Sequence, residues 1–382
     1  MTPEKQQITA QKSVINIVFA SAGFTSVDLP IIQTAEPFLD LSGEDIRRRI
    51  YVFSDPYGKE LCLRPDLTIP ACLHYLEATG AMDGERRFAY EGLAFRCQVP
   101  GSARPNEFSQ SGIELIGQKD DKDSGAKADA EVFRLTLAAC RKAGLAGFEV
   151  KMGDLGLFAA FIEALDIPEH WRARLRNSFW QPSRFGGLLK GLTERQKKPE
   201  GVAAVLGKLD EASALETVSG LLDIAGLDSV PGRSIESVTR RLMEKARDAA
   251  SEPLSPGIIT SIEDYLKISG APREALKHIR KLAGVHDIAI DEALEVAETR
   301  ARLIEEVAGD APVIFATEFG RSFEYYTGFV FELTDGGEQI AGGGRYDDLL
   351  LRLGAPKRVP AVGAMIRNDR LAAVLAGQKG AK

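Results

Sequence analysis

The chain has 382 residues, of which 44% are hydrophobic and 27% charged, so we expect an ordinary globular protein with two or three domains, or one large core with an insertion. Its formal net charge of −7 argues against a broad nucleic-acid-binding surface, which needs clustered lysine and arginine to meet phosphates. No stretch approaches the roughly 18 apolar residues of a membrane span, and the polar N-terminus lacks a signal-peptide core, so a cytoplasmic location is expected.

The four cysteines show no spacing typical of a metal site or a redox pair. They are Cys62, Cys72, Cys97 and Cys140, and none of them belongs to a C-x-x-C pattern. We therefore expect reduced, partly buried side chains rather than disulfides, and we predict neither a metal site nor a cofactor.

The first part of the chain mixes helices with short strands. Apolar residues at helical spacing predict a helix over residues 5–22, followed by a short strand that ends at Pro30. Residues 50–55 and 60–64 predict a hairpin, and a second helix follows it. Two polar residues lie at the start of that helix. Asp66 taken alone is a turn residue, and Thr68 is a candidate N-cap.

Residues 90–117 predict a long hairpin with an unusual polar face. Two halves with strand-like alternation flank a loop at 100–106 that contains proline and glycine. Arg96 lies in the first predicted strand, whereas Gln110 and Glu114 share one face of the second. Such polar groups are costly to bury without a ligand or one another. An Arg–Glu pair on a solvated face is the simpler interpretation of this stretch alone.

A mainly helical region follows. A helix, a strand and a helix are predicted over residues 129–143, 148–154 and 155–165. From 168 to 308 apolar residues recur at helical period with little strand signal, so this segment is predicted to be a helical insertion. Residues 1–167 and 309–382 then form the two parts of one core.

Strands return near the C-terminal end. Residues 329–333 and 338–341 flank a turn, and three glycines at 342–344 come next. Glycines let a backbone approach a neighbour closely or bend, so Gly342–Tyr346, with Tyr325 and Tyr326 beside it, is also a candidate for a segment with two backbone arrangements. Residues 362–366 predict a strand, and Asp369 begins the closing helix.

Four separated segments, in order, resemble the catalytic core of histidyl-tRNA synthetase, a class II synthetase. They are LRPDLT at 63–68, the 90–117 hairpin with its arginine, RSFEYY at 321–326 and GGGRYD at 342–347. The resemblance covers residues from about 10 to 120 and from about 310 to the end. It implies an α+β fold, with a class II aminoacyl-tRNA synthetase-like antiparallel sheet flanked by helices and, here, a mainly helical insertion.

The resemblance also implies a pocket for free histidine. An amino acid needs a carboxylate for its ammonium group, a cation for its carboxylate and polar partners for an imidazole ring. The residues that the resemblance places around this ligand are Asp66, Arg96, Gln110, Glu114, Arg321, Tyr325 and Tyr326. The family usually has glutamate where this chain has Asp66, which is shorter but keeps the charge. A structural relic without a ligand is the alternative.

The nucleotide site departs from the synthetase pattern. Gln98 stands where the family has glutamate, and Val99 where it commonly has arginine. In the last motif Arg367 replaces a glycine that lies beneath the adenine, whereas Arg370 matches the motif's arginine. The weakened charge and the bulky cation indicate that the slot for the base is blocked.

A synthetase core with these departures, and with no anticodon-binding domain expected after the last motif, resembles the regulatory subunits of ATP phosphoribosyltransferase. That resemblance implies a non-catalytic dimer that partners the short-form catalytic subunit in the first step of histidine biosynthesis. It would activate that subunit, sense histidine for feedback inhibition, and bind neither tRNA nor membrane. Two other interpretations stay open: a truncated active synthetase that forms histidyl-adenylate, and a synthetase-like module that binds tRNA or another protein.

Overall fold

The computed structural model describes residues 3–41, 44–79, 84–102, 104–179, 182–192, 201–206, 209–224, 253–320 and 325–380, with a few further positions between 235 and 246. The chain divides into two compact units, Met1–Gln181 with Asp264–Lys382, and Pro182–Glu263. The second unit spans fewer residues than the helical insertion expected at 168–308. The division of the chain into domains stays a prediction.

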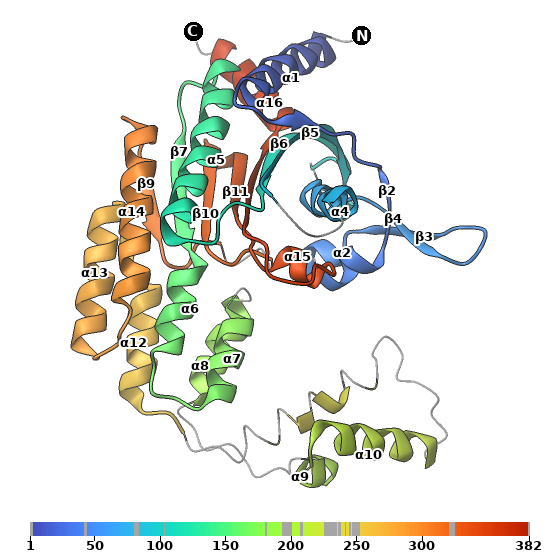
Figure 1. The fold of residues 1–382 in the computed structure, drawn as a ribbon, viewed down its shortest axis with the longest axis vertical. Coiled ribbons are helices and arrows are strands. Elements are labelled where there is room, and N and C mark those ends of the chain that lie inside the picture. The colour runs from blue at the N-terminus through green and yellow to red at the C-terminus, as the bar shows by residue number, and fades with distance from the viewer. Residues whose placement is uncertain are drawn as a thin grey trace. The chain divides into compact units, whose positions relative to one another are not determined.

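The first unit is built on a nine-stranded sheet with the order β1-β5-β6-β12-β11-β10-β7-β9-β8 (Figure 1). Its strands are β1 (Thr25–Ser26), β5 (Arg86–Phe95), β6 (Glu107–Ile116), β7 (Glu149–Asp154), β8 (Ser269–Gly270), β9 (Val313–Ala316), β10 (Phe329–Asp335), β11 (Glu338–Arg345) and β12 (Ala361–Arg367). The β1–β5 and β7–β9 pairs are parallel, and the other neighbours are antiparallel. A smaller sheet has the order β2-β4-β3 and consists of β2 (Ile32–Thr34), β3 (Tyr51–Ser54) and β4 (Glu60–Leu63).

Helices flank the large sheet, which confirms the α+β prediction. The described helices are α1 (Pro3–Ser21), α2 (Glu36–Leu41), α3 (Glu44–Arg47), α4 (Thr68–Thr79), α5 (Lys122–Lys142), α6 (Leu155–Glu163), α7 (Glu169–Ser178), α8 (Pro182–Leu192), α9 (Val202–Leu206), α10 (Glu211–Ile224), α12 (Pro256–Leu266), α13 (Pro272–Val285), α14 (Asp291–Ala308), α15 (Leu349–Arg352) and α16 (Asn368–Gly380). The short strand β8 was not predicted, because two residues are too few to show a strand period.

The predicted long hairpin is formed by β5 and β6, which pair from Phe95 with Glu107 to Arg86 with Ile116. Strand β5 ends one residue before Arg96, whose backbone N–H still donates to Asn106 O at 2.8 Å. The hairpin curves around α4 (Figure 1), and β6 contacts both α4 and α5. Because helices cover both of its faces, every residue of β6 after the first is buried.

The glycine run Gly342–Gly344 lies inside β11 and is paired with β10 on one side and β12 on the other. A Cβ atom on Gly343 would lie 2.2 Å from Gly363 O, and one on Gly344 would lie 2.5 Å from Phe329 O. The glycines therefore allow close approach between strands in this arrangement, and a second backbone arrangement of this segment stays a prediction.

The described helices include none that is long and apolar enough to cross a membrane. Three of the cysteines are buried, Cys97 is exposed, and all four are free. In the described part of the chain, no group of three or more His, Cys, Asp and Glu side chains is arranged to hold a metal ion.

Candidate ligand-binding site

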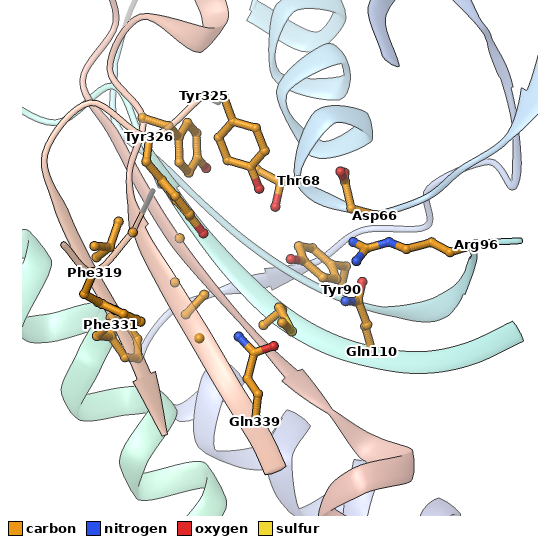
Figure 2. Close-up of a pocket in the computed structure, with 18 residues that line it drawn as sticks. Asp66, Thr68, Tyr90, Arg96, Gln110, Phe319, Tyr325, Tyr326, Phe331 and Gln339 are labelled. Atoms are coloured by element: carbon orange, nitrogen blue, oxygen red, sulfur yellow. The ribbon is translucent and has the colours of Figure 1, made fainter. Parts of the chain in front are cut away.

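A pocket lies over β11 and β12, between the turn before α4, the β5–β6 hairpin and the segment that leads into β10 (Figure 2). It is lined by Asp66, Thr68, Tyr90, Arg96, Gln110, Phe319, Gly320, Tyr325, Tyr326, Val330, Phe331, Gln339, Gly342, Gly343, Tyr346, Gly363, Ala364 and Met365. Five of the seven residues predicted to bind a ligand are in this set. Glu114 lies against its lining, and Arg321 is outside the described residues.

Glu114 is a carboxyl with no exposed surface, so the interpretation of the hairpin as carrying a solvated Arg–Glu pair is wrong. Its Oε1 accepts a hydrogen bond from the Tyr90 hydroxyl at 3.0 Å, and its Oε2 accepts one from the Tyr346 hydroxyl. Burial raises the pKa of Glu114 from 4.5 to about 7, while the hydroxyls of Tyr346, Thr68 and Tyr90 act in the opposite direction. The carboxyl can therefore change its charge near neutral pH.

Two glycines make room for this carboxyl. A Cβ atom on Gly363 would lie 1.4 Å from Glu114 Oε2, and one on Gly112 would lie 2.5 Å from the Tyr90 hydroxyl. Both distances are below 3.0 Å, a separation shorter than real Cβ atoms show. The site therefore requires glycine at these two places on β12 and β6.

Asp66 and Arg96 lie side by side at one end of the pocket (Figure 2). Asp66 Oδ1 accepts from the Ile69 N–H at 3.2 Å, so this side chain, rather than that of Thr68, caps α4. Burial raises the pKa of Asp66, and the nearby Arg96 opposes that shift. Arg96 donates from Nε to Pro65 O at 2.9 Å, which aims the rest of its guanidinium towards the pocket (Figure 2).

Aromatic rings cover the pocket on the other side. The ring centroids of Tyr325 and Tyr326 are 4.8 Å apart, and the Tyr346 ring lies 6.0 Å from the first and 6.5 Å from the second. Opposite them Gln110 is only 2% exposed and projects from β6 (Figure 2). The pocket thus combines an acid, a base, an amide and phenols, which is the set of groups that a zwitterionic amino acid requires.

Arg367 is the residue that the sequence predicts to block the slot for the nucleotide base. Its guanidinium carbon lies 3.8 Å from the ring centroid of Phe108, and that of Arg96 lies 5.4 Å from the same ring. Arg367 also forms a two-bond ion pair with Asp369, at 3.1 and 2.9 Å. Because cation–π contact and ion pairing both hold it, the arginine covers an aromatic ring on which a nucleotide base could otherwise stack.

Gln98 and Arg370, two further residues of the expected nucleotide site, form hydrogen bonds within the protein. The Gln98 amide donates to Arg96 O at 3.1 Å and to Pro105 O at 3.3 Å, and accepts from Arg49 at 3.0 Å. Arg370 donates to Gln339 O at 2.9 Å. These bonds fix the loop and the arginine to the rest of the protein.

Sequence reasoning missed the residues that surround Glu114, namely Tyr90 and Tyr346, and the role of Thr68 as one of its partners. It also missed Phe108 beneath Arg367. The sequence contained one local signal for Tyr90. Gly112, between Gln110 and Glu114, stands directly opposite Tyr90 in the hairpin register, and a glycine facing a tyrosine indicates that the ring lies across it.

Comparisons with known proteins show the family of the chain. A family model described as histidyl-tRNA synthetase matches residues 2–220 and 213–371. Two relatives, from Brucella anthropi and Brucella canis, are each named ATP phosphoribosyltransferase regulatory subunit. They are 36% and 35% identical over 362 and 361 residues, and each match covers 92% of this chain and 93% of the relative.

Two solved structures share the fold. A Bacillus halodurans protein described as an ATP phosphoribosyltransferase regulatory subunit/histidyl-tRNA synthetase has a TM-score of 0.66 at 23% identity, covering 98% of this chain and 80% of the other. The histidyl-tRNA synthetase of Nostoc has a TM-score of 0.63 at 18% identity, covering 98% and 73%. These similarities show a class II synthetase-like fold.

Proposed function

This chain belongs to the family of ATP phosphoribosyltransferase regulatory subunits, and we propose that it binds free histidine in the pocket beside Glu114 and so controls its catalytic partner. As the name of its relatives implies, it is a regulatory subunit that acts with the catalytic ATP phosphoribosyltransferase and is not itself the catalyst. The observation that carries histidine binding is Glu114, a fully buried carboxyl next to a pocket that Asp66 and Arg96 also face.

Each charged end of histidine has a partner in this pocket. Asp66 suits the ammonium group, and the inward-facing Arg96 suits the carboxylate. Glu114, with Tyr346 and Tyr90 attached, supplies the polar environment that an imidazole ring needs. The cost of burying the Asp66 and Glu114 carboxyls, and of partly burying the Arg96 guanidinium, is offset when a ligand brings the complementary charges.

A truncated synthetase that forms histidyl-adenylate is less well supported. Arg367 covers Phe108, and Gln98 and Arg370 make their hydrogen bonds within the protein. ATP would have to displace an ion pair and a cation–π contact to stack there. The net charge of −7 gives no support to a module that binds tRNA.

Calorimetry on the purified chain tests this proposal. We expect histidine to bind at or below millimolar concentration, and histidinol, which lacks the carboxylate, to bind about ten- to a hundredfold more weakly because it loses a charge-assisted hydrogen bond with Arg96. In a parallel assay we expect no histidine-dependent exchange between ATP and pyrophosphate. Absence of histidine binding in both the free chain and the complex, or clear exchange activity, would refute the proposal.

We also propose that the chain forms a dimer through its N-terminal segment. Apolar side chains on and beside the small sheet are unusually exposed: Ile32 by 53%, Val52 by 43% and Phe53 by 39%. Exposed apolar side chains gathered in one region are typical of association surfaces. In sedimentation at micromolar concentration we expect a dimer, and a monomer for Phe53→Asp. A monomeric wild-type chain would contradict this.

A further inference from the structure

We propose that an ion network behind the pocket, formed by the buried residues Asp129, Arg300, Arg345 and Asp347 and by the exposed Arg358, positions the Tyr346 hydroxyl against Glu114 and keeps the pocket ready for its ligand. These five residues are called the ion network below. The inference rests on the proposed histidine site for its functional meaning, although the geometry that it predicts can be measured without a ligand. None of the five residues is among those that line the pocket.

Arg345, the last residue of β11, is the centre of the ion network. It is 7% exposed, and its guanidinium reaches Asp129 at 2.7 and 2.9 Å, Asp347 at 2.9 Å and Gly125 O at 2.9 Å. Asp129, on α5, has no exposed surface and also pairs with Arg300 of α14 at 2.7 Å. The network thus fixes the end of β11 to two helices.

Asp347 continues the network towards β12 and β10. Its carboxylate accepts from Arg358 at 2.9 Å and from the N–H of Ala361, the first residue of β12, at 2.9 Å. Its own N–H donates to the Thr327 hydroxyl at 3.0 Å, and the Thr327 N–H donates to Arg345 O at 2.8 Å. The segment before β10 is therefore fixed to the same cluster.

Tyr346 lies between two members of this network along the chain. Its ring is 1% exposed, its N–H donates to Ala361 O at 2.8 Å, and its hydroxyl reaches Glu114. Tyr326, which lines the pocket beside it, directly precedes Thr327. Two pocket tyrosines are thus carried by backbone that the ion network fixes, although neither tyrosine is part of it.

The network is better suited to positioning than to stability. Buried ion pairs repay their desolvation only in part, and apolar replacements are often neutral or stabilising. What they do supply is a defined geometry, because each guanidinium and carboxylate must keep its partners. Here that geometry includes the direction of the Tyr346 side chain, so Arg345 and Asp347 are positioning residues for the pocket.

The pKa of Glu114 depends on where the Tyr346 hydroxyl lies. The titratable and charged groups around Glu114 are Asp66 and Cys72 at α4, Tyr90 on β5, Tyr325 and Tyr326 before β10, and Tyr346 after β11. After burial, which raises its pKa, the hydrogen bond from Tyr346 is the first influence that lowers it. Displacing that hydroxyl should raise the pKa of Glu114.

The test is a titration of the ligand-free full chain, labelled with ¹³C at the glutamate carboxyl and followed by NMR, with Glu114→Gln to assign the signal. In Asp347→Asn we expect the pKa of Glu114 to rise by about one unit. The sign is decisive, because removal of a negative charge by itself would lower the pKa of a nearby carboxyl. Thr327→Val, which changes no charge, should shift it in the same direction and decides the question if Asp347→Asn fails to fold.

The matched control is Glu131→Gln, which removes a carboxylate of the same helix α5 that pairs with Arg87 at 2.8 Å. It should leave the pKa of Glu114 unchanged, and an equal shift in this control would overturn the inference. An unchanged or lowered pKa in the variants of Asp347 and Thr327 would overturn it as well. Calorimetry of the same variants separates the two proposals: wild-type protein that binds no histidine refutes the proposed function, while the titration still decides this inference.

Discussion

The complex of this chain with its catalytic subunit should keep its activation and lose most of its histidine inhibition when Glu114 is replaced by glutamine. The replacement has nearly the same shape but cannot carry the negative charge. A charge-assisted hydrogen bond is worth about 1.5–3 kcal/mol, so the histidine concentration for half inhibition should rise about ten- to a hundredfold. Initial rates at a series of histidine concentrations measure it. Glu131→Gln, away from the pocket, serves as the control.

The effect on inhibition is a coupling free energy between two sites. A ligand moves an equilibrium only by the difference in its affinity for the two states, so the histidine-bound pocket must favour the inhibited complex. Coupling between binding events is reciprocal. The factor by which histidine changes the affinity of the two subunits for each other, usually about 5–150-fold, is therefore also the factor by which the catalytic subunit changes the histidine affinity of this chain. If the Glu114→Gln complex is as sensitive to histidine as the wild type, the regulatory site lies on the catalytic partner.

The β5–β6 hairpin, and the strand β12 followed by the helix α16, could be predicted because their signals are local. Alternating residues around a proline- and glycine-containing loop indicated β5 and β6, and the same alternation placed Gln110 and Glu114 on one face. The resemblance added Asp66, Arg96, Tyr325 and Tyr326 to the same pocket, and the structure brings all four together there. Their role as histidine ligands stays a prediction.

The ion network could not be predicted because its partners are remote in sequence. Arg300 and Asp129 are 171 residues apart, and Arg345 and Asp129 are 216 apart. Nothing in a local pattern distinguishes a charged residue with such a partner from one on a solvated helix face. The glycine run is ambiguous for a related reason: glycine permits both bending and close approach, and a local pattern does not show which neighbouring strands the run will meet.

A second large effect is expected in the stability of the free chain, again with Glu114→Gln. Burial raises the pKa of Glu114 from 4.5 to about 7, so the folded state holds a proton that the unfolded chain releases above pH 4.5. The free energy of unfolding therefore falls as pH rises through this window and is constant, for this group, above it. The difference between the two pKa values corresponds to about 3 kcal/mol, at about 1.4 kcal/mol for each unit.

Glutamine mimics the protonated acid and removes this penalty. Urea unfolding should show the variant close to wild type near pH 4.5 and more stable by about 3 kcal/mol at pH 8. The difference between the two proteins is the informative quantity, because other groups titrate equally in both. Tyr90→Phe, which removes a hydroxyl that lowers the pKa of Glu114, should instead be less stable than wild type, and more so at pH 8. A difference between glutamine variant and wild type that does not change with pH would mean that Glu114 keeps one charge state throughout.

Together the two measurements separate binding from packing as the reason for a buried carboxyl at this place. A group that costs stability above neutral pH is retained when its charge serves a ligand, and functional sites commonly lower stability in this way. One substitution should then stabilise the chain and make its complex insensitive to histidine. If the glutamine variant is instead less stable at every pH, Glu114 supports its neighbours Tyr90 and Tyr346, and the loss of inhibition would need another explanation.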